Sequence, residues 1–552
     1  MKNEGGITGA SVNHCKHNSS SGRIVDHLLP NVMRASFLLL LVLGLAFTAK
    51  ATVTLPVIFT DHMVLQRERP VPVWGWAEAG REVNVKFAGQ VKATKADKDG
   101  KWKVMLDPLK ASNDPQNLMV SGQNTVVIKD VLVGEVWLCS GQSNMAMTVK
   151  GVQDAEKEIA AANFPLIRMF FVQSFTATSP QEQCLGVWQA CSPRTIPNFS
   201  ATAYFFGRNL HQTLKVPVGL INSSVGGTAI ESWTSMEAMK DKAELQPLLE
   251  QWRKDVALFE QPENMAKNEA AKKQWQEAVK AAQAAKQPAP PQPVYVGREP
   301  LQPNRPGNLF NGKIAPIIPF AIRGAIWYQG ESNAGNGPLY ATQLPLMIRD
   351  WRTRWGNEFP FAWVQLPNFL KREAEPGAAS HWARLREAQS KSLAVPKTGM
   401  SINLDIGDAG NIHPLNKQEI GRRLALWARA QVYAEKIPWS GPLYESHEIR
   451  GNEVVIRFTH AEGLKTADGS TTLKGFAIAD ATQKWQWAEA RIVGDHVIVS
   501  HPGIQTPMAV RYAWANNPDV NLINGTGLPA GPFRTDDWPM DNFSMPLKSG
   551  AK

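Results

Sequence analysis

The sequence predicts an α/β protein with a parallel sheet covered by helices on both faces, flanked on each side by a β-rich region. Between residues 131 and 436, nearly continuous apolar runs alternate with helical stretches, which is typical of parallel strands buried on both faces. Before and after that region, short apolar runs are separated by Gly, Pro and Asp-Gly turns, which favours smaller β-domains.

Composition limits the class of protein. The chain has 552 residues, of which 43% are apolar and 20% charged. These values fit a soluble globular protein of two or three domains and argue against a disordered chain, a coiled coil or a multispan membrane protein. The net charge is +10, but Lys and Arg are scattered and no basic stripe or nucleic-acid module is present. We therefore expect no nucleic-acid partner.

Residues 1–51 are predicted to be a targeting region. An apolar run at residues 36–47 follows a basic residue and is too short to span a bilayer, and Ala49-Lys50-Ala51 is a typical cleavage signal. We expect cleavage after Ala51. A compact signal peptide would begin at Met33, although a long n-region starting at residue 1 is the alternative. The mature protein is thus expected to be exported, to the periplasm or outside the cell, with no membrane association after cleavage.

The remaining chain divides into three regions. Residues 52–130 are expected to form an N-terminal β-domain, residues 131–436 the catalytic domain, and residues 437–552 a C-terminal β-rich domain. The catalytic domain carries an insertion at about residues 236–300 that is rich in Ala, Glu, Lys and Gln and ends in a Pro-rich linker. This composition favours a helical hairpin, with a solvated excursion or a lid as alternative roles.

Three cysteines follow the targeting region. An odd number in an exported protein suggests one disulfide and one buried thiol, and Cys184 and Cys191 are close enough in sequence to close a short loop. Cys139 lies in an apolar strand and is expected in the core. No C-x-x-C pair and no clustered histidines are present, so no structural zinc site is expected.

Four polar blocks follow predicted strands of the central region. They contain Ser143, the glycine pair Gly226 and Gly227, Asn333 and His413. Each block alone also fits an ordinary cap, tight turn or loop hydrogen bond. Because the carboxyl ends of parallel strands share one edge, however, the sheet would gather a nucleophile, hydrogen-bond donors and a base in one place.

These blocks resemble the Ser-Gly-Asn-His (SGNH, or GDSL-like) hydrolase superfamily and, more narrowly, the sialate O-acetylesterase family. The resemblance rests on long segments that cover nearly the whole mature chain, apart from the helical insertion and the last residues: IFTDHMVLQRERPVPVWGWA, GEVWLCSGQSNM, FSATAYFFGRNL, SSVGGTAIESW, GAIWYQGESNA, NIHPLNKQEIGRRLA and PMAVRYAWANNPDVNLINGTGLPAGPFRTDDW. It implies an SGNH/flavodoxin-like parallel sheet and an esterase that removes O-acetyl groups from sugars.

Residue roles carry over from this resemblance. Ser143 would be the nucleophile and His413 the general base. The oxyanion hole would use the Ser143 N–H, an N–H of Gly226 or Gly227, and the Asn333 side chain. No metal and no organic cofactor is implied, and the expected partner is an O-acetylated sugar or glycan.

One position departs from the family pattern. The superfamily usually has Asp three residues before the histidine, where this chain has Gly410. Asp408 is the favoured carboxylate for orienting the imidazole of His413. Asp405 could instead brace the loop, and a Ser-His dyad oriented by a backbone carbonyl is a third alternative.

The sequence alone does not determine the substrate. Candidate substrate-binding residues are Gln142, Glu331 and Arg384, the last with Arg386 as a partner for a substrate carboxylate such as that of sialic acid; a structural role is the alternative for each. The substrate could be a 9-O-acetyl sialic acid or an acetylated plant polysaccharide. A non-catalytic glycan-binding protein is the alternative function. The absence of a G-x-S-x-G motif counts against a peptidase or lipase of the α/β-hydrolase type.

Overall fold

The computed structural model describes residues 52–173, 176–377 and 380–539. The chain from Ala51 onward forms a single unit by its internal contacts. The predicted signal segment, its start at Met33 and its cleavage after Ala51 lie outside the described residues.

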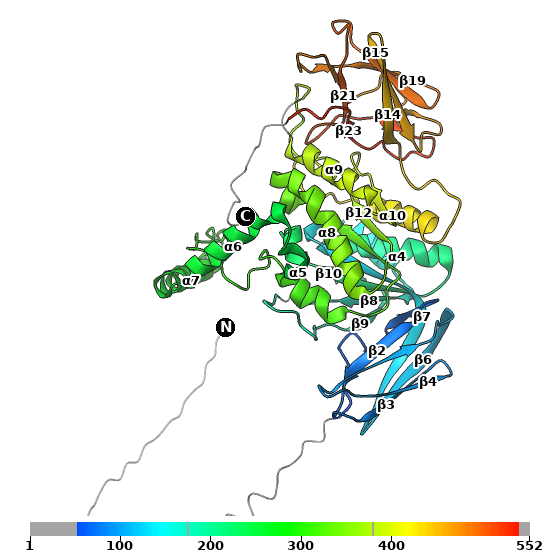
Figure 1. Cartoon of the computed structure of the whole chain (residues 1–552), viewed down its shortest axis with the longest axis vertical. Coiled ribbons are helices and arrows are strands. Elements are labelled where there is room, and N and C mark those ends of the chain that lie inside the picture. The colour runs from blue at the N-terminus through cyan, green and yellow to red at the C-terminus, as the bar shows by residue number, and fades with distance from the viewer. Residues whose placement is uncertain (1–51, 174–175, 378–379, 540–552) are drawn as a thin grey trace, which may run out of the picture. The chain divides into compact units, whose positions relative to one another are not determined.

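The N-terminal region is a set of strands, antiparallel except for one parallel pair, that feeds directly into the central sheet (Figure 1). Its strands are β1 (Val64–Gln66), β2 (Val71–Trp76), β3 (Glu82–Phe87), β4 (Gln90–Lys95), β5 (Lys101–Leu106), β6 (Ser112–Ser121) and the long β7 (Thr125–Gly141). The first half of β7 pairs with β6 and the second half with strands of the central sheet. The boundary expected at residue 130 therefore falls inside one strand.

Asp130 marks the point where β7 passes between the two regions. Its backbone has a positive φ of 52°. The guanidinium of Arg168, in the central sheet, donates to both carboxylate oxygens of Asp130, at 2.7 and 3.1 Å. A charge-assisted, two-point contact of this kind fixes an otherwise unfavourable conformation.

The central sheet has the strand order β13-β12-β11-β7-β10-β8-β9. Its strands beyond β7 are β8 (Phe164–Phe171), β9 (Trp188–Cys191), β10 (Val218–Ser224), β11 (Gly324–Tyr328), β12 (Phe361–Val364) and β13 (Thr398–Ser401). All neighbours pair in parallel except β8 and β9. The predicted α/β class is confirmed, while β8 and the antiparallel edge strand β9 were not among the predicted strands.

The chain changes direction across the sheet at β7. From β7 it builds β8 and β10 on one side, and then β11, β12 and β13 on the other. Gly141 at the end of β7 is in register with Ser224 at the end of β10 and with Tyr328 at the end of β11. Three strand ends therefore lie level at a topological switch point, which is where open α/β sheets bind ligands.

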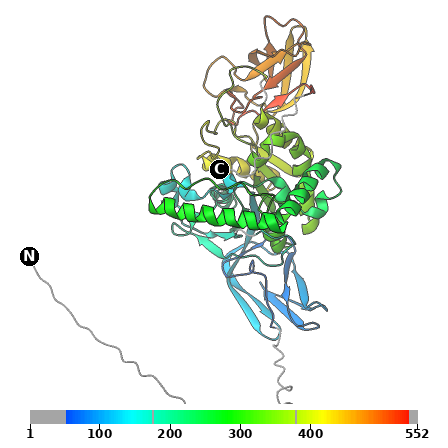
Figure 2. The same ribbon diagram turned by 90° about the vertical axis from the view of Figure 1, so that its left-hand side faces the viewer.

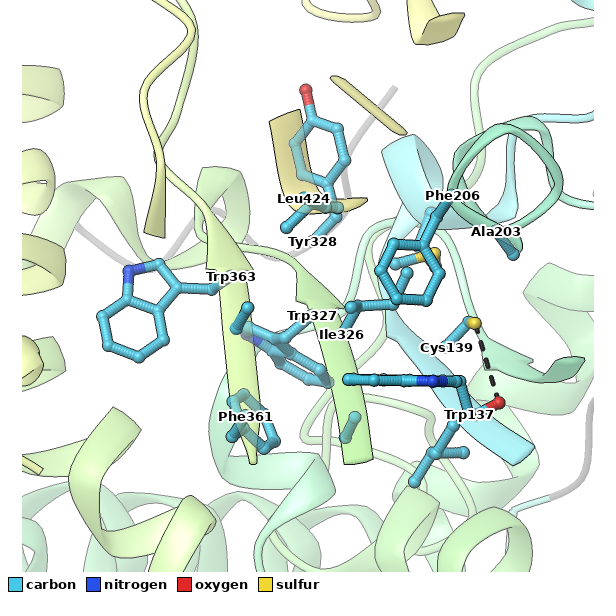
Figure 3. Packing of buried hydrophobic residues seen from close by; sticks show 14 of the residues in the cluster. Trp137, Cys139, Ala203, Phe206, Ile326, Trp327, Tyr328, Phe361, Trp363 and Leu424 are labelled. Carbon is cyan, nitrogen blue, oxygen red and sulfur yellow. Dashed lines mark hydrogen bonds between the residues drawn. The ribbon is translucent and has the colours of Figure 1, made fainter. Parts of the chain in front are cut away.

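Helices cover both faces of this sheet. They are α2 (Ser143–Ala146), α3 (Ala155–Ala160), α4 (Ala201–Leu214), α8 (Gly337–Trp355), α9 (His381–Lys391) and α10 (Lys417–Gln431). On one face, Trp137 packs edge-on against Phe206 of α4 and Trp427 of α10; on the other, Trp327 packs edge-on against Trp351 of α8. Figure 3 shows this core, with side chains from alternate strand positions directed to opposite faces. The two apolar layers fix the strand ends that carry the polar blocks.

The insertion consists of α5 (Met236–Met239), α6 (Gln246–Phe259) and α7 (Pro262–Ala284), with α6 and α7 projecting from the central domain (Figures 1 and 2). After α7 the chain runs back along this helix and is held there by Asn268. The Asn268 side-chain amide donates to the Val296 carbonyl at 2.9 Å and accepts from the Val296 N–H at 2.8 Å. The insertion is helical, as its composition favours, but the segment that returns along α7 is non-helical chain and not a second helix.

The C-terminal region holds two four-stranded sheets and one short strand pair. Its strands are β14 (Leu443–Arg450), β15 (Glu453–Thr459), β16 (Lys465–Thr466), β17 (Phe476–Ala479), β18 (Gln486–Trp487), β19 (Glu489–Val493), β20 (His496–Ser500), β21 (Ala509–Tyr512), β22 (Leu522–Ile523) and β23 (Phe533–Arg534). The buried guanidinium of Arg386 in α9 joins this region to the central one, donating to the carbonyls of Leu366 and Ala515 at 2.7 and 2.8 Å.

The expected disulfide is absent. Cys139, Cys184 and Cys191 are all free thiols, and all are buried. Cys191 ends β9, and its Sγ donates to the Ala162 carbonyl at 3.6 Å instead of meeting Cys184. Burial raises the pKa of Cys184 to about 11 and that of Cys191 to about 12, so both remain protonated. The prediction of one pair was wrong because Cys184 lies in the irregular segment before β9 and Cys191 at the end of that strand, and closeness in sequence does not bring the two thiols together.

Candidate active site

Ser143 begins α2, directly beyond the end of β7. The turn between them requires glycine at position 141, where φ is 142° and an added Cβ would lie 2.1 Å from the Tyr328 carbonyl oxygen. The next N–H, that of Gln142, donates to the same carbonyl at 2.9 Å. This close approach of β7 and β11 turns the chain sharply and leaves Ser143 partly exposed at the sheet edge.

His413 meets Ser143 at this edge. Its Nε2 lies 2.8 Å from the Ser143 Oγ, and the imidazole is partly exposed. Burial, followed by the positive charge of Lys417, lowers the pKa of His413 below its usual value of 6.5. A neutral imidazole at this distance can accept the serine proton, which is what a general base requires.

The structure does not bring Asp408 to the imidazole. The Asp408 Oδ1 accepts the N–H groups of Gly410 and Asn411 at 2.7 and 3.1 Å, so this exposed carboxylate closes its own turn. Asp405 forms a two-point ion pair with Arg423 of α10, with both contacts at 2.7 Å. Within residues 52–173, 176–377 and 380–539, the His413 ring makes one hydrogen bond, to Ser143. Asp405 thus braces the loop, and the ring has no carboxylate partner there.

Backbone donors face the same place. An added Cβ on Gly226 would lie 3.4 Å from the Ser143 Cβ, so Gly226 passes directly beside Ser143. Both Gly226 and Gly227 are exposed. Throughout the described part of the chain, the N–H groups of Ser143, Gly226 and Gly227 bond to no other protein group. They remain able to donate to an oxyanion.

Asn333 lies in the 3₁₀ turn after β11 with its amide orientation fixed. The Oδ1 accepts from the Ile230 N–H at 3.0 Å and from the Gln329 Nε2 at 2.7 Å, while the Nδ2 donates to Glu231 at 3.0 Å. One Nδ2 hydrogen is left for a ligand. Sequence reasoning missed Glu231, whose signal was a carboxylate in an otherwise apolar segment just after the glycine pair. Burial raises the pKa of Glu231, and hydrogen bonds from Asn333 and Gln343 oppose that rise.

A family model described as carbohydrate esterase, sialic acid-specific acetylesterase, matches residues 133–289. The sialate O-acetylesterase of Rattus norvegicus is 30% identical over 527 residues, which is 86% of this chain and 92% of the rat protein. That of Homo sapiens is 30% identical over 524 residues, covering 86% and 90%.

A solved structure agrees. A carbohydrate acetylesterase from Xanthomonas citri is 37% identical and superposes with a TM-score of 0.74, covering 88% of this chain and all of that one. The chain belongs to the sialate O-acetylesterase family. It is therefore a member of a family of hydrolases that act on carboxylic esters, and its fold matches that of a carbohydrate acetylesterase.

The candidate substrate residues Gln142 and Glu331 both make hydrogen bonds within the protein. The Gln142 Oε1 accepts the N–H groups of Gly330 and Ser332 at 3.4 and 3.2 Å, which ties the nucleophile turn to the Asn333 turn. Glu331 accepts from the Asn144 Nδ2 at 2.5 Å. Arg384 lies partly exposed in α9, with its Cβ beside the backbone of Gly337 at the start of α8.

Arg386, considered with Arg384 for a substrate carboxylate, is instead buried against backbone carbonyls, as described above.

Two further buried residues at the site, Asn144 and Lys417, were missed by sequence reasoning. In the quoted motifs Asn144 directly follows Ser143 and Lys417 lies four residues after His413, but nothing in the pattern indicated their contacts.

Across the described ranges, no group of three or more His, Cys, Asp or Glu side chains is arranged to hold a metal ion. Within the same ranges, no helix has the length and apolar character needed to cross a bilayer.

Proposed function

We propose that this protein is an exported carbohydrate O-acetylesterase that hydrolyses acetyl esters on sugar hydroxyls through an acetyl-enzyme on Ser143. The observation that carries the proposal is the 2.8 Å contact between the Ser143 Oγ and the His413 Nε2, beside unbonded N–H groups at the sheet edge. Family membership supports the ester chemistry.

The proposed reaction begins with neutral His413. It takes the Ser143 proton as the Oγ attacks the acetyl carbonyl, and the tetrahedral oxyanion is held by the N–H groups of Ser143 and Gly226 or Gly227 and by the Asn333 amide. His413 then gives its proton to the departing sugar oxygen. Water activated by the same imidazole releases acetate and restores the serine.

The acetylated sugar is proposed by class. The names of the curated relatives point to sialate esters, and that of the Xanthomonas citri structure points to carbohydrate acetyl esters more broadly. We therefore propose 9-O-acetyl sialic acid or an acetylated plant polysaccharide as the two substrate classes to be separated by experiment.

Acetate release tests the proposal. Purified mature chain, residues 52–552, would be assayed beside Ser143→Ala on 9-O-acetyl sialic acid, acetylated xylan, acetylated xyloglucan and an aryl acetate. Release that depends on Ser143 is expected, and the preferred glycan identifies the substrate. A folded chain that releases no acetate from any of them would contradict the proposal and favour a glycan-binding protein.

Export is the second part of the proposal, and it rests on the targeting pattern of residues 33–51. Expression of the full chain in a bacterial host should yield a periplasmic or secreted product. Mass spectrometry of its N-terminus should give Thr52 as the first residue. A cytoplasmic product that retains residues 33–51 would contradict export without touching the esterase proposal.

A further inference from the structure

Lys417 is a buried cation that the proposed reaction does not use. It is the first residue of α10, where the helix dipole disfavours positive charge, and its side chain is fully buried. Among the described residues it forms no ion pair with a carboxylate. Burial lowers its pKa to about 7, with the charge of Glu331 opposing the fall. Helix stability and charge pairing do not explain this side chain. Its contacts are a cation–π approach of the Nζ to the Tyr328 ring, at 5.1 Å from the ring centroid, and a set of hydrogen bonds.

Those hydrogen bonds surround His413. The Lys417 Nζ donates to the Pro414 carbonyl at 2.8 Å and to the Asn144 Oδ1 at 2.6 Å. The Asn144 Nδ2 donates to the Ile412 carbonyl at 3.0 Å. The carbonyls just before and just after His413 are therefore both held by a pair of side chains, one of which is adjacent to Ser143.

Glu331 fixes the orientation of this pair. Its Oε1 accepts from the Asn144 Nδ2 at 2.5 Å, so the amide nitrogen faces Glu331 and Ile412 while the amide oxygen faces Lys417. The other carboxylate oxygen of Glu331 is buried without a hydrogen-bond partner in the described chain. Asn144 is itself fully buried. A reversed amide would lose all three contacts at once.

We propose that Asn144 and Lys417 are positioning residues that hold the His413 imidazole against Ser143, in the role that a carboxylate has in a three-residue triad. The proposal rests on the proposed function, since it assigns roles within the Ser143–His413 mechanism. The His413 ring has no carboxylate partner in the described residues, so its placement depends on the backbone that Asn144 and Lys417 hold.

A pH effect follows from the same geometry. The groups around the imidazole are Ser143 on α2, Lys417 on α10 and, through Asn144, Glu331 in the turn after β11, while Asp408 on the same loop faces its own backbone. The Lys417 charge disfavours imidazolium. Removal of that charge should therefore raise the pKa of His413 and move the acid limb of kcat/KM to higher pH.

Lys417→Met tests the proposal, because methionine has a similar length but neither a charge nor a donor. With 4-nitrophenyl acetate, we expect kcat to fall on the order of 10²-fold with little change in KM, since a misplaced base slows the chemical step. Lys313→Met is the matched control. Lys313 is also fully buried and donates to a backbone carbonyl, that of Val172 near the end of β8, so this variant should keep the wild-type kcat and pH profile.

Asn144→Asp provides a second variant if Lys417→Met does not fold. The aspartate keeps an acceptor for Lys417 but loses the donor to the Ile412 carbonyl, so kcat should again fall while thermal unfolding stays cooperative. The rate at which an aryl phosphonate labels Ser143, followed by intact mass, should fall in parallel.

The outcomes separate the two proposals. If Ser143→Ala is inactive but folded Lys417→Met and Asn144→Asp keep kcat within about threefold and show an unshifted acid limb, the positioning proposal is overturned alone. If Ser143→Ala keeps its activity, the serine mechanism itself is overturned.

Discussion

Ser143 and His413, the proposed nucleophile and base, occupy the same edge of the sheet but reach it by different means. Ser143 follows β7 after a single intervening residue, and the turn is set by Gly141 and the Tyr328 carbonyl. His413 is separated from β13 by residues 402–412. In the order of the sheet, β13 is the third strand from β7, with β12 and β11 between them. At about 4.8 Å per strand, the base loop has to cross on the order of 14 Å of sheet edge.

The difference shows which interactions fix each group. Backbone sterics fix the short nucleophile turn, whereas side-chain contacts fix the long base loop. Asp405 pairs with Arg423, the Gly407 N–H donates to the Asn368 Oδ1 at 2.7 Å, and Asn144 holds the Ile412 carbonyl. A substitution in the turn should therefore damage folding, and one in the loop should mainly damage catalysis.

The largest effect is expected when either reacting group is removed. Ser143→Ala and His413→Ala should each lower kcat on the order of 10⁴–10⁶-fold, and the double variant should be no slower, because the two groups act as a unit. Steady-state acetate release measures this, with near-native thermal unfolding as the control. Additive losses would mean that the 2.8 Å contact is not used in the reaction.

Gly141→Ala should be the most damaging change to stability. The new Cβ would meet the Tyr328 carbonyl at 2.1 Å in a backbone conformation that other residues rarely adopt, at a cost of about 2–4 kcal/mol. Denaturant unfolding measures the change. Gly356→Ala is the control, because φ there is also positive, at 62°, but the space is open, so its cost should be about 1 kcal/mol.

Asp405→Asn should loosen the base loop without unfolding it. Loss of the two-point pair with Arg423 should lower kcat about fivefold, in keeping with about 1 kcal/mol for a partly exposed pair. Glu419→Gln is the matched control, because Glu419 binds the same guanidinium from within α10 and leaves the loop contact intact. Equal losses in the two variants would contradict a specific effect on the loop.

The pH dependence of kcat/KM should report the base. His413 acts when neutral and its pKa lies below 6.5, so activity should persist from neutral pH to below 6.5 and fall on further acidification through the His413 pKa. Rates between pH 4 and 8, with stability checked at each pH, measure the midpoint. A midpoint above 6.5 would contradict the environment described for the imidazole.

Asp408→Asn should have the smallest effect. An asparagine Oδ1 can accept the same N–H groups of Gly410 and Asn411, so kcat should stay within about twofold of wild type. Acetate-release kinetics measure it. A loss approaching that of His413→Ala would restore Asp408 as the residue that orients the imidazole.

The same contrast explains how much could be predicted from the sequence. Continuous apolar strands predicted the sheet, and motifs directly after strand ends predicted Ser143, the glycine pair and Asn333, because the edge of a parallel sheet gathers such residues. The candidate acid could not be located, since whether Asp408 or Asp405 reaches His413 depends on how a long loop folds. The contacts of Lys417 and Asn144 join segments far apart in the chain and leave no local pattern.

One strand, β7, belongs to two regions at once. Val131 and Val133 are buried and pair with β6, while Trp137 and Leu138 pair with strands of the central sheet. The central region therefore does not start with a strand of its own. A chain started at residue 131 would expose an unpaired strand edge in the same element that ends at the nucleophile. Gene fusions or truncations should keep residues 52–141 together, because the N-terminal β-rich region and the strand that leads to Ser143 share one element.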